Sequence, residues 1–235
     1  MYYITCDIDW APEIVIEDFL NLLQEHNVKS TIFATHDSPV LQSCDPKLVE
    51  IGIHPNYNPL LDSDSTIVRA EILSNLLNIY PDAKGVRSHS LFQSSNILQD
   101  YVDNGLQYDC NQFMPYQKIV SPFKWFNGLV RVPYNWEDDI HFLNNFSFDN
   151  LLLDDSDNLN ILDFHPIHVY LNTAKLSHYT LAKRHYNNPT ELLAYRNNKT
   201  LGTRDLFISV LKQISTSETI GELVARFLYE DSYNR

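Results

Sequence analysis

The chain has 235 residues and a formal net charge of −13, and aliphatic and aromatic residues make up 44% of it. This length suits one α/β domain over residues 1–235 with a substantial core, rather than two independent cores. The acidic balance argues against nucleic acid or an anionic membrane as the main partner, because phosphate contacts need a basic surface.

Cysteine usage and hydropathy point to a reducing compartment. The three cysteines are widely spaced and form no Cys-x-x-Cys pair, so neither a disulfide framework nor a zinc–thiolate site is indicated. Residue 2 already belongs to the first expected strand, which leaves no room for a signal peptide, and no apolar run approaches membrane-spanning length. We therefore expect a cytoplasmic protein without a transmembrane segment. The pattern predicts nothing about its oligomeric state.

The first expected strand, residues 2–8, leads into two carboxylates. Side chains alternate faces along a strand, so Asp7 and Asp9 point the same way. Two carboxylates on one side of a strand end repel each other unless a cation or an arginine lies between them. Capping the following helix would need only one of them, so the pair predicts a functional site.

Short apolar runs then alternate with amphipathic helical patterns. Helices are expected over residues 12–26, 65–80 and 96–104. Strands are expected over residues 30–35, 50–54, 85–89 and 106–110. Asp62 or Asp64 is the expected cap of the second helix. His54, Asn58 and Arg87 lie at or just after the ends of expected strands.

The second half of the chain continues the alternation less regularly. Residues 112–127 are rich in proline and aromatic residues and predict a long loop or a hairpin. Strands are expected over 129–133 and 159–164, on either side of an acidic, Asn-rich stretch. A polar segment over 172–200 is expected to cover part of the molecule, and a helical pattern over 203–229 is expected to break near Ser217. Alternating strands and helices imply a parallel sheet or barrel, whose sites form at the carboxyl ends of strands.

Three of the polar residues at strand ends form a candidate site for a divalent cation. Asp9 and His54 supply a carboxylate and an imidazole, and the amide oxygen of Asn58 completes a three-point site with an open position for water. Asn56 competes with Asn58 for the third place. Zn²⁺ is the first expectation for the metal, with Ni²⁺, Co²⁺, Mn²⁺ or Fe²⁺ as alternatives.

The neighbouring residues suit proton transfer around such a cation. Asp7 is a candidate general base, kept ionised by Arg87, because a nearby cation favours the charged form of a carboxyl group. His165 follows the last expected strand and is a candidate general acid for a leaving amine. These parts together predict metal-assisted hydrolysis of an amide.

Five segments, taken in order over about residues 2–170, resemble the motif series of the polysaccharide deacetylase (NodB-homology, carbohydrate esterase 4-like) family. They are Thr5-Cys6-Asp7-Ile8-Asp9, Ile53-His54-Pro55-Asn56-Tyr57-Asn58, Val86-Arg87-Ser88-His89, Arg131-Val132-Pro133-Tyr134-Asn135-Trp136-Glu137-Asp138-Asp139 and Leu162-Asp163-Phe164-His165. Each motif alone is unspecific, and five in the right order are much stronger. The resemblance is to a divergent, WbmS-like branch, and it implies an α/β fold: a distorted, incomplete (β/α) barrel of the NodB-homology type.

The resemblance also implies roles for individual residues. Asp7 matches the general base of the family and Asp9 matches a metal ligand. Arg87 matches the arginine that orients the base, and His165 matches the general acid. Leu162 would form a wall of the substrate pocket.

The chain departs from the family pattern at several positions. Asn58 stands where the second motif usually has a second histidine, which should lower the affinity for metal. The third motif normally carries Pro-Tyr where this chain has His89-Ser90, so His89 is left without a role. The carboxylate that supports the acid would be Asp138 or Asp139, and Asp139 is the one taken as a catalytic candidate.

The expected activity is hydrolysis of an N-acetyl or N-formyl group on a sugar, or on a sugar-linked intermediate of surface polysaccharide biosynthesis. An N-acylated sugar is therefore the expected partner. One alternative is a carbohydrate-binding relative without turnover. The other is a phosphatase resembling the haloacid dehalogenases, with Asp7 as nucleophile, Asp9 as acid/base around Mg²⁺, and Asp154-Asp155 imitating the late acidic pair. Against it, His54 and His165 would then have no function.

Overall fold

A nine-stranded sheet forms the framework of the computed structural model, which describes residues 1–62, 64, 66–153 and 158–233. The order of the strands in the sheet is β6-β7-β5-β4-β3-β2-β1-β9-β8. The strands are β1 (Tyr2–Asp7), β2 (Ser30–Ala34), β3 (Val49–Ile53), β4 (Gly85–Val86), β5 (Tyr108–Asp109), β6 (Phe123–Lys124), β7 (Val130–Arg131), β8 (Trp136–Glu137) and β9 (Asn160–Phe164). Neighbouring strands are parallel, except that β6 runs antiparallel to β7.

The sheet curls into the distorted, incomplete (β/α) barrel that the sequence predicts. Within the described residues β6 and β8 are its two edges and are not neighbours, so the barrel stays open on one side. Strand β1 pairs with β2 and β9, and its last five residues are buried. A strand buried on both faces is typical of parallel sheets, and it explains the largely apolar character of the residues before Asp7.

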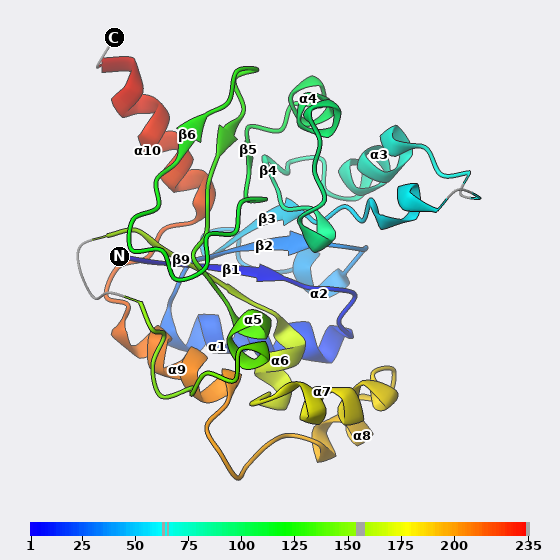
Figure 1. The fold of residues 1–235 in the computed structure, drawn as a ribbon, viewed down its shortest axis with the longest axis vertical. Coiled ribbons are helices and arrows are strands. Elements are labelled where there is room, and N and C mark those ends of the chain that lie inside the picture. The colour runs from blue at the N-terminus through cyan, green and yellow to red at the C-terminus, as the bar shows by residue number, and fades with distance from the viewer. Residues whose placement is uncertain (63, 65, 154–157, 234–235) are drawn as a thin grey trace.

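Helices cover the outside of the barrel (Figure 1). The α-helices are α1 (Glu13–His26), α2 (Pro39–Gln42), α3 (Arg69–Ile79), α4 (Ser95–Asp103), α5 (Asp138–Leu143), α6 (Pro166–Leu171), α7 (Leu176–Ala182), α8 (Pro189–Ala194), α9 (Thr203–Gln213) and α10 (Ile220–Tyr233). The 3₁₀ turns are η1 (Asn58–Leu61), η2 (His89–Leu91) and η3 (Lys183–His185). Among the helices described, none has the length and apolar character to cross a membrane.

Side-chain alternation divides the core into two layers. One buried cluster lies between the sheet and helices such as α1, α6 and α9, where Phe19 stacks on Phe207 at 4.8 Å between ring centroids. The other lies inside the barrel and includes Tyr3 and Ile161, together with apolar residues of α10. Leu162 belongs to the outer layer, so it cannot form the pocket wall that the resemblance implied.

Several element boundaries differ from the predicted ones. The helix expected over 65–80 begins at Arg69 after the extended Val68, without a side-chain cap from Asp62 or Asp64, and residue 65 lies outside the described residues. The strands expected over 85–89, 106–110 and 129–133 each pair over only two residues. The predicted break near Ser217 is confirmed, because α9 ends at Gln213 and α10 begins at Ile220.

The acidic stretch after residue 136 holds two elements that the sequence analysis missed. Strand β8 pairs with β9, and α5 follows it directly. The short helix buries Asp138, His141 and Phe142, so its inner face is largely polar and gives no apolar periodicity. For residues 112–127 the hairpin alternative is confirmed in part, since β6 pairs antiparallel with β7.

Candidate active site

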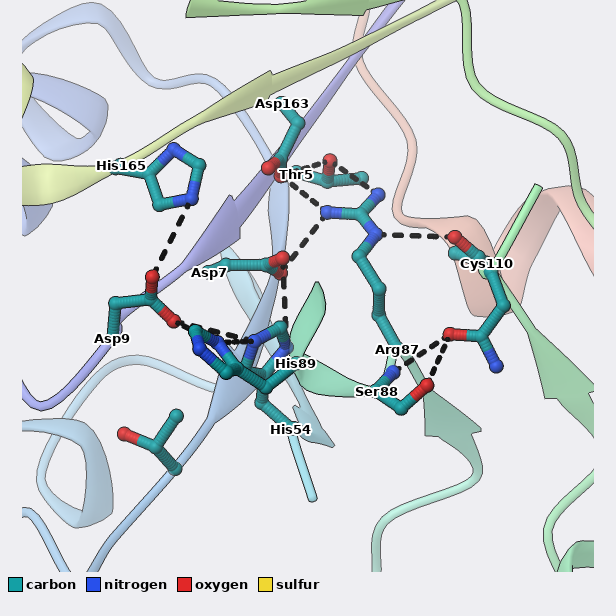
Figure 2. Close-up of polar contacts among 12 residues, drawn as sticks. Thr5, Asp7, Asp9, His54, Arg87, Ser88, His89, Cys110, Asp163 and His165 are labelled. Atoms are coloured by element: carbon teal, nitrogen blue, oxygen red, sulfur yellow. Dashed lines mark hydrogen bonds and ion pairs between the residues drawn. The ribbon is translucent and has the colours of Figure 1, made fainter. Parts of the chain in front are cut away.

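Polar side chains from four strands converge at one end of the barrel (Figure 2). Asp7 ends β1, and Asp9 follows it by two residues. His54, Arg87 and His165 each come directly after or just beyond β3, β4 and β9. These are the carboxyl ends of parallel strands, where barrel folds build their sites. The sequence-predicted residues other than Asn58 and Asp139 are therefore brought together.

A buried arginine fixes the position of Asp7. Arg87 Nη1 donates to Asp7 Oδ1 at 3.0 Å and also to Asp163 Oδ1, while Nη2 donates to Thr5 Oγ1 at 2.9 Å and Nε to the carbonyl of Cys110 at 3.2 Å. Both Arg87 and Asp163 are fully buried. A guanidinium held by this many acceptors has little freedom to move, so it holds the Asp7 carboxylate in one orientation.

Asp163 is a member of this network that the sequence analysis missed. It pairs with Thr5 in the register of β9 against β1, and Thr5 Oγ1 donates to its Oδ1 at 2.8 Å. Alternation could have found it, because Asp163 lies two residues before His165 and shares its face. Asp163 thus contributes the second negative charge that balances Arg87 inside the barrel.

Burial sets the acidity of Asp7. The residue is 5% exposed, and desolvation raises its pKa to about 6, against the lowering effect of the Arg87 charge. Asp7 Oδ2 also lies 3.5 Å from Nδ1 of His54. A carboxylate with a pKa closer to neutrality is a stronger base than an exposed one, which suits proton abstraction.

Asp9 forms a three-donor cluster with His54 and His89. Asp9 Oδ1 lies 3.3 Å from His54 Nε2 and 3.1 Å from His89 Nδ1, and the two ring nitrogens are 3.3 Å apart. Bonds of about 2.0–2.2 Å to a shared cation would place its donor atoms about 3.0–3.5 Å apart. The three atoms are therefore spaced as ligands of one divalent ion, and two imidazoles with a carboxylate are a common donor set for Zn²⁺.

Hydrogen bonds alone do not account for this triangle. A neutral imidazole carries one ring proton, so if both rings donate to Asp9, the nitrogens of His54 and His89 face each other without an acceptor between them. Any other placement of the protons also leaves one side of the triangle unsatisfied. One cation would satisfy all three lone pairs, so the residues present fit a divalent metal.

The surroundings keep Asp9 ionised. Burial opposes ionisation, but hydrogen bonds from His54 and His89 outweigh it and hold the pKa of Asp9 well below its usual range. Asp9 and Trp10 have positive φ angles of 43° and 56°, a conformation uncommon for residues other than glycine. Tyr186 Oη donates to the carbonyl of Asp9 at 2.9 Å and helps to hold this turn.

The amides proposed as third ligand are engaged elsewhere. Asn58 Nδ2 donates to Ser90 Oγ at 3.1 Å, and Asn56 Oδ1 accepts the backbone N–H of Asn58 at 3.0 Å. Within the described residues, neither amide is hydrogen-bonded to the triangle. His89 supplies the third donor atom of the triangle. The strand expected over 85–89 would put His89 on the face of Arg87, but β4 ends at Val86 and His89 lies in η2, so the turn and not alternation directs its side chain.

His165 is supported by Asp138 and not by Asp139. His165 Nδ1 lies 2.8 Å from Asp138 Oδ1, and Asp138 Oδ2 accepts the backbone N–H of His165 at 2.9 Å. Asp139, the candidate taken from the sequence, has a buried oxygen without a hydrogen-bond partner. Burial lowers the pKa of His165, but Asp138 outweighs it and raises this pKa well above its ordinary value.

The fold and the strand-end site place the chain among barrel enzymes. Its family can be stated more closely, because the model of the WbmS-like polysaccharide deacetylase family matches residues 4–183. The chain belongs to this family, and it is a hydrolase acting on carbon–nitrogen bonds other than peptide bonds. Comparison with curated proteins gave no match. Membership in this family argues against the phosphatase alternative, and residues 154 and 155 lie outside the described residues.

Solved structures agree with this assignment. The crystal structure of WbmS from Bordetella bronchiseptica, a proposed polysaccharide deacetylase involved in O-antigen biosynthesis, is 40% identical and superposes with a TM-score of 0.85 over 90% of each chain. A proposed polysaccharide deacetylase from Mycobacterium smegmatis is 16% identical, with a TM-score of 0.61 over 98% of this chain and 90% of the other. The latter likeness shows the fold alone.

A similar fold also forms part of a protein named for a different reaction. A 4-alpha-glucanotransferase from Thermococcus litoralis is 12% identical, with a TM-score of 0.51 over 96% of this chain and 38% of the other. Fold by itself therefore does not assign the chemistry, which has to be argued from the side chains of the site.

Proposed function

We propose that the protein removes an N-acyl group, acetyl or formyl, from a sugar or a sugar-linked intermediate of surface polysaccharide biosynthesis, and that it needs a divalent cation, first of all Zn²⁺. The observation that carries the proposal is the three-donor triangle beside the buried Asp7–Arg87 pair. The described role of the 40% identical relative in O-antigen biosynthesis supports the choice of a polysaccharide sugar.

Asp9, His54 and His89 would hold the cation, and His89 replaces Asn58 in the ligand set that we propose. When bound there, a divalent ion would lower the pKa of a water molecule and polarise the acyl carbonyl. The buried His54 and the half-buried Asp9 and His89 limit the side on which water and substrate can approach.

Asp7 acts as the general base. It takes a proton from the attacking water as the water oxygen forms its bond to the acyl carbon. Arg87 and Asp163 keep the carboxylate oriented, and the Asp7 oxygen facing His54 lies next to the triangle. That oxygen lies 3.5 Å from Nδ1 of His54, and Nε2 of the same ring belongs to the triangle, so the base is close to the proposed cation site.

His165 acts as the general acid. As the bond between the acyl carbon and the nitrogen breaks, Nε2 of His165 gives its proton to the nitrogen, so the products are a free carboxylic acid and an amine. Asp138 holds the other ring nitrogen and favours the protonated ring. His165 Nε2 lies 3.8 Å from Asp9 Oδ2, on the opposite side of Asp9 from the two other histidines.

Removal of divalent cations tests the proposed metal dependence. Treatment with a chelator is expected to abolish release of acetate or formate from N-acylated amino sugars, and Zn²⁺ is expected to restore it. Binding of the ion should also stabilise the stripped protein against unfolding by about 2.7 kcal/mol at 100 times the dissociation constant. Acyl release that persists in demonstrably metal-free protein, or turnover of phosphate esters instead, would contradict the proposal.

The two adjacent aspartates of α5 give a matched pair of variants. Asp138→Asn removes the carboxylate that raises the pKa of His165, so this histidine should lose its proton at lower pH. The alkaline limb of the pH profile of kcat/KM is therefore expected to move to lower pH. Asp139→Asn is the control and should leave that limb in place. A shift of the alkaline limb in Asp139→Asn, with no shift in Asp138→Asn, would indicate that Asp139 is the carboxylate that supports His165.

A further inference from the structure

The polar segment over residues 172–200, which we call the cover segment, differs in charge from the rest of the chain. It contains five lysine and arginine residues and one carboxylate, Glu191, so its net charge is +4 in a chain of −13. Glu191 is itself paired with His185 at 2.6 Å. A basic element in an otherwise acidic protein concentrates anions near its surface.

Most cations of the cover segment have no carboxylate partner. Elsewhere basic side chains commonly form ion pairs, such as Lys29 with Glu222 at 2.5 Å. Four cations of the cover segment each form no ion pair with any residue that the structure describes. They are Lys175, Lys183, Arg184 and Lys199. These charges are therefore available to a ligand.

Two of these lysines line a cavity of about 340 Å³, together with His178, Arg196 and Asn198. The lining residues include no carboxylate. His178 contacts the carbonyl of Tyr195 through Nε2, and its buried Nδ1 has no hydrogen-bond partner among the residues described. The cavity thus offers positive charge and an unpartnered polar atom, a combination that suits an oxyanion.

This cavity lies at the opposite end of the short helix α6 from His165. Arg196 Nε donates to the carbonyl of Tyr170 at 2.6 Å, and the N–H of Asn197 donates to that of Leu171 at 2.8 Å, both at the end of α6. His165 precedes the first residue of α6, and six helical residues span about 9 Å. Figure 1 shows α7 and α8 of the cover segment beside α6.

The cover segment also contacts the candidate site, at Asp9 directly and at His165 through His168. The ring of Tyr179 packs edge-on against His168 at 4.6 Å between centroids, and His168 contacts the His165 ring in the same way at 5.6 Å. The hydrogen bond from Tyr186 to the carbonyl of Asp9 connects the segment to the cation site. The cover segment therefore extends from the lysine-lined cavity to the proposed reaction centre, and one extended ligand could contact both.

We propose that the cover segment binds a phosphate-type anionic group of the substrate, while the N-acyl group of the attached sugar lies at Asp7 and the cation site. This inference rests on the proposed function and narrows its substrate to a sugar that carries a phosphate or diphosphate. Lysine ammonium groups form strong charge-assisted hydrogen bonds with phosphate oxygens. The diphosphate of a nucleotide-linked sugar and that of a lipid-linked sugar share this chemistry.

Direct binding of inorganic pyrophosphate to the full chain, measured by calorimetry at low ionic strength, tests the inference without turnover. Lys175→Gln combined with Lys199→Gln is expected to weaken binding by about tenfold or more, because two charge-assisted contacts are lost. The matched control is Lys47→Gln combined with Lys212→Gln, two exposed lysines outside the cover segment, which should bind as wild type. Equal melting temperatures of the two double variants would verify that both fold.

Two further probes distinguish the sources of the phosphate group. Tighter binding of uridine diphosphate than of geranyl diphosphate indicates a nucleotide carrier, and the reverse order indicates a lipid carrier. Failure of the wild type to bind pyrophosphate, or equal affinity of both double variants, overturns the inference even if the protein deacylates sugars. If pyrophosphate binding is lost only in the cover-segment variant but the wild type deacylates no sugar, the anion site stands and the proposed function is contradicted.

Discussion

Asp7→Asn is expected to lower kcat/KM for an N-acylated sugar by about 10²–10⁴, the usual contribution of a general base. Asparagine keeps the shape of the side chain, and Arg87 retains Asp163 as a buried counter-charge, so the fold should survive. Bound metal should remain, because Asp7 is outside the proposed ligand set. The measurements are steady-state release of the acid product and metal content of the purified variant.

Asp163→Asn is the matched control for Asp7→Asn. It removes the same charge from the same arginine but leaves the base in place, so its loss of activity should be smaller. Equal losses of kcat/KM in both variants would indicate that Asp7 only balances the charge of Arg87 and is not the general base. A wild type without activity, whose sugar affinity is unchanged by Asp7→Asn, would indicate a carbohydrate-binding protein that has lost turnover.

His89→Ala is expected to remove bound metal and activity together. Residues that only support a metal ligand typically change metal affinity by about 10–100-fold, so loss of a direct ligand should exceed about 100-fold. The metal content of the variant, measured by elemental analysis, should fall from about one ion per chain to a small fraction of that. Reloading with Zn²⁺ then measures the change in affinity.

Asn58→Ala is the comparison for His89→Ala. The Asn58 amide is hydrogen-bonded to Ser90, so this variant should keep its metal and most of its activity. Loss of metal in Asn58→Ala, with metal retained in His89→Ala, would restore the ligand set predicted from sequence. The pair therefore separates the two proposals for the third ligand.

The barrel was predictable because its signals are local. The apolar residues of β1, and the helical spacing of Phe19 and Leu23 on the inner face of α1, are each visible within a segment of at most 14 residues. Later strands pair over only two residues, so their sequences carry little periodic signal. The helix α5 escaped notice because its inner face carries Asp138 and His141 in place of aliphatic residues.

The proposed site divides in the same way. Asp7 and Asp9 are predicted from one strand end, and Arg87 and His165 from the order of the motifs. The choice between Asp138 and Asp139 could not be predicted from the sequence. Adjacent residues at the start of a helix point in different directions, and only Asp138 contacts His165. Asp163 and Thr5 are 158 residues apart in sequence, and only the pairing of β1 with β9 joins them.

The residue pattern was therefore sufficient for the family, the type of barrel and the edge of the sheet at which chemistry is expected, since alternation and motif order are properties of short segments. Packing was needed to bring His89 beside Asp9, 80 residues away, and to set Asp138 against His165. Such contacts depend on strand order and on tight turns, including the left-handed backbone at Asp9 and Ser90, which no local pattern encodes.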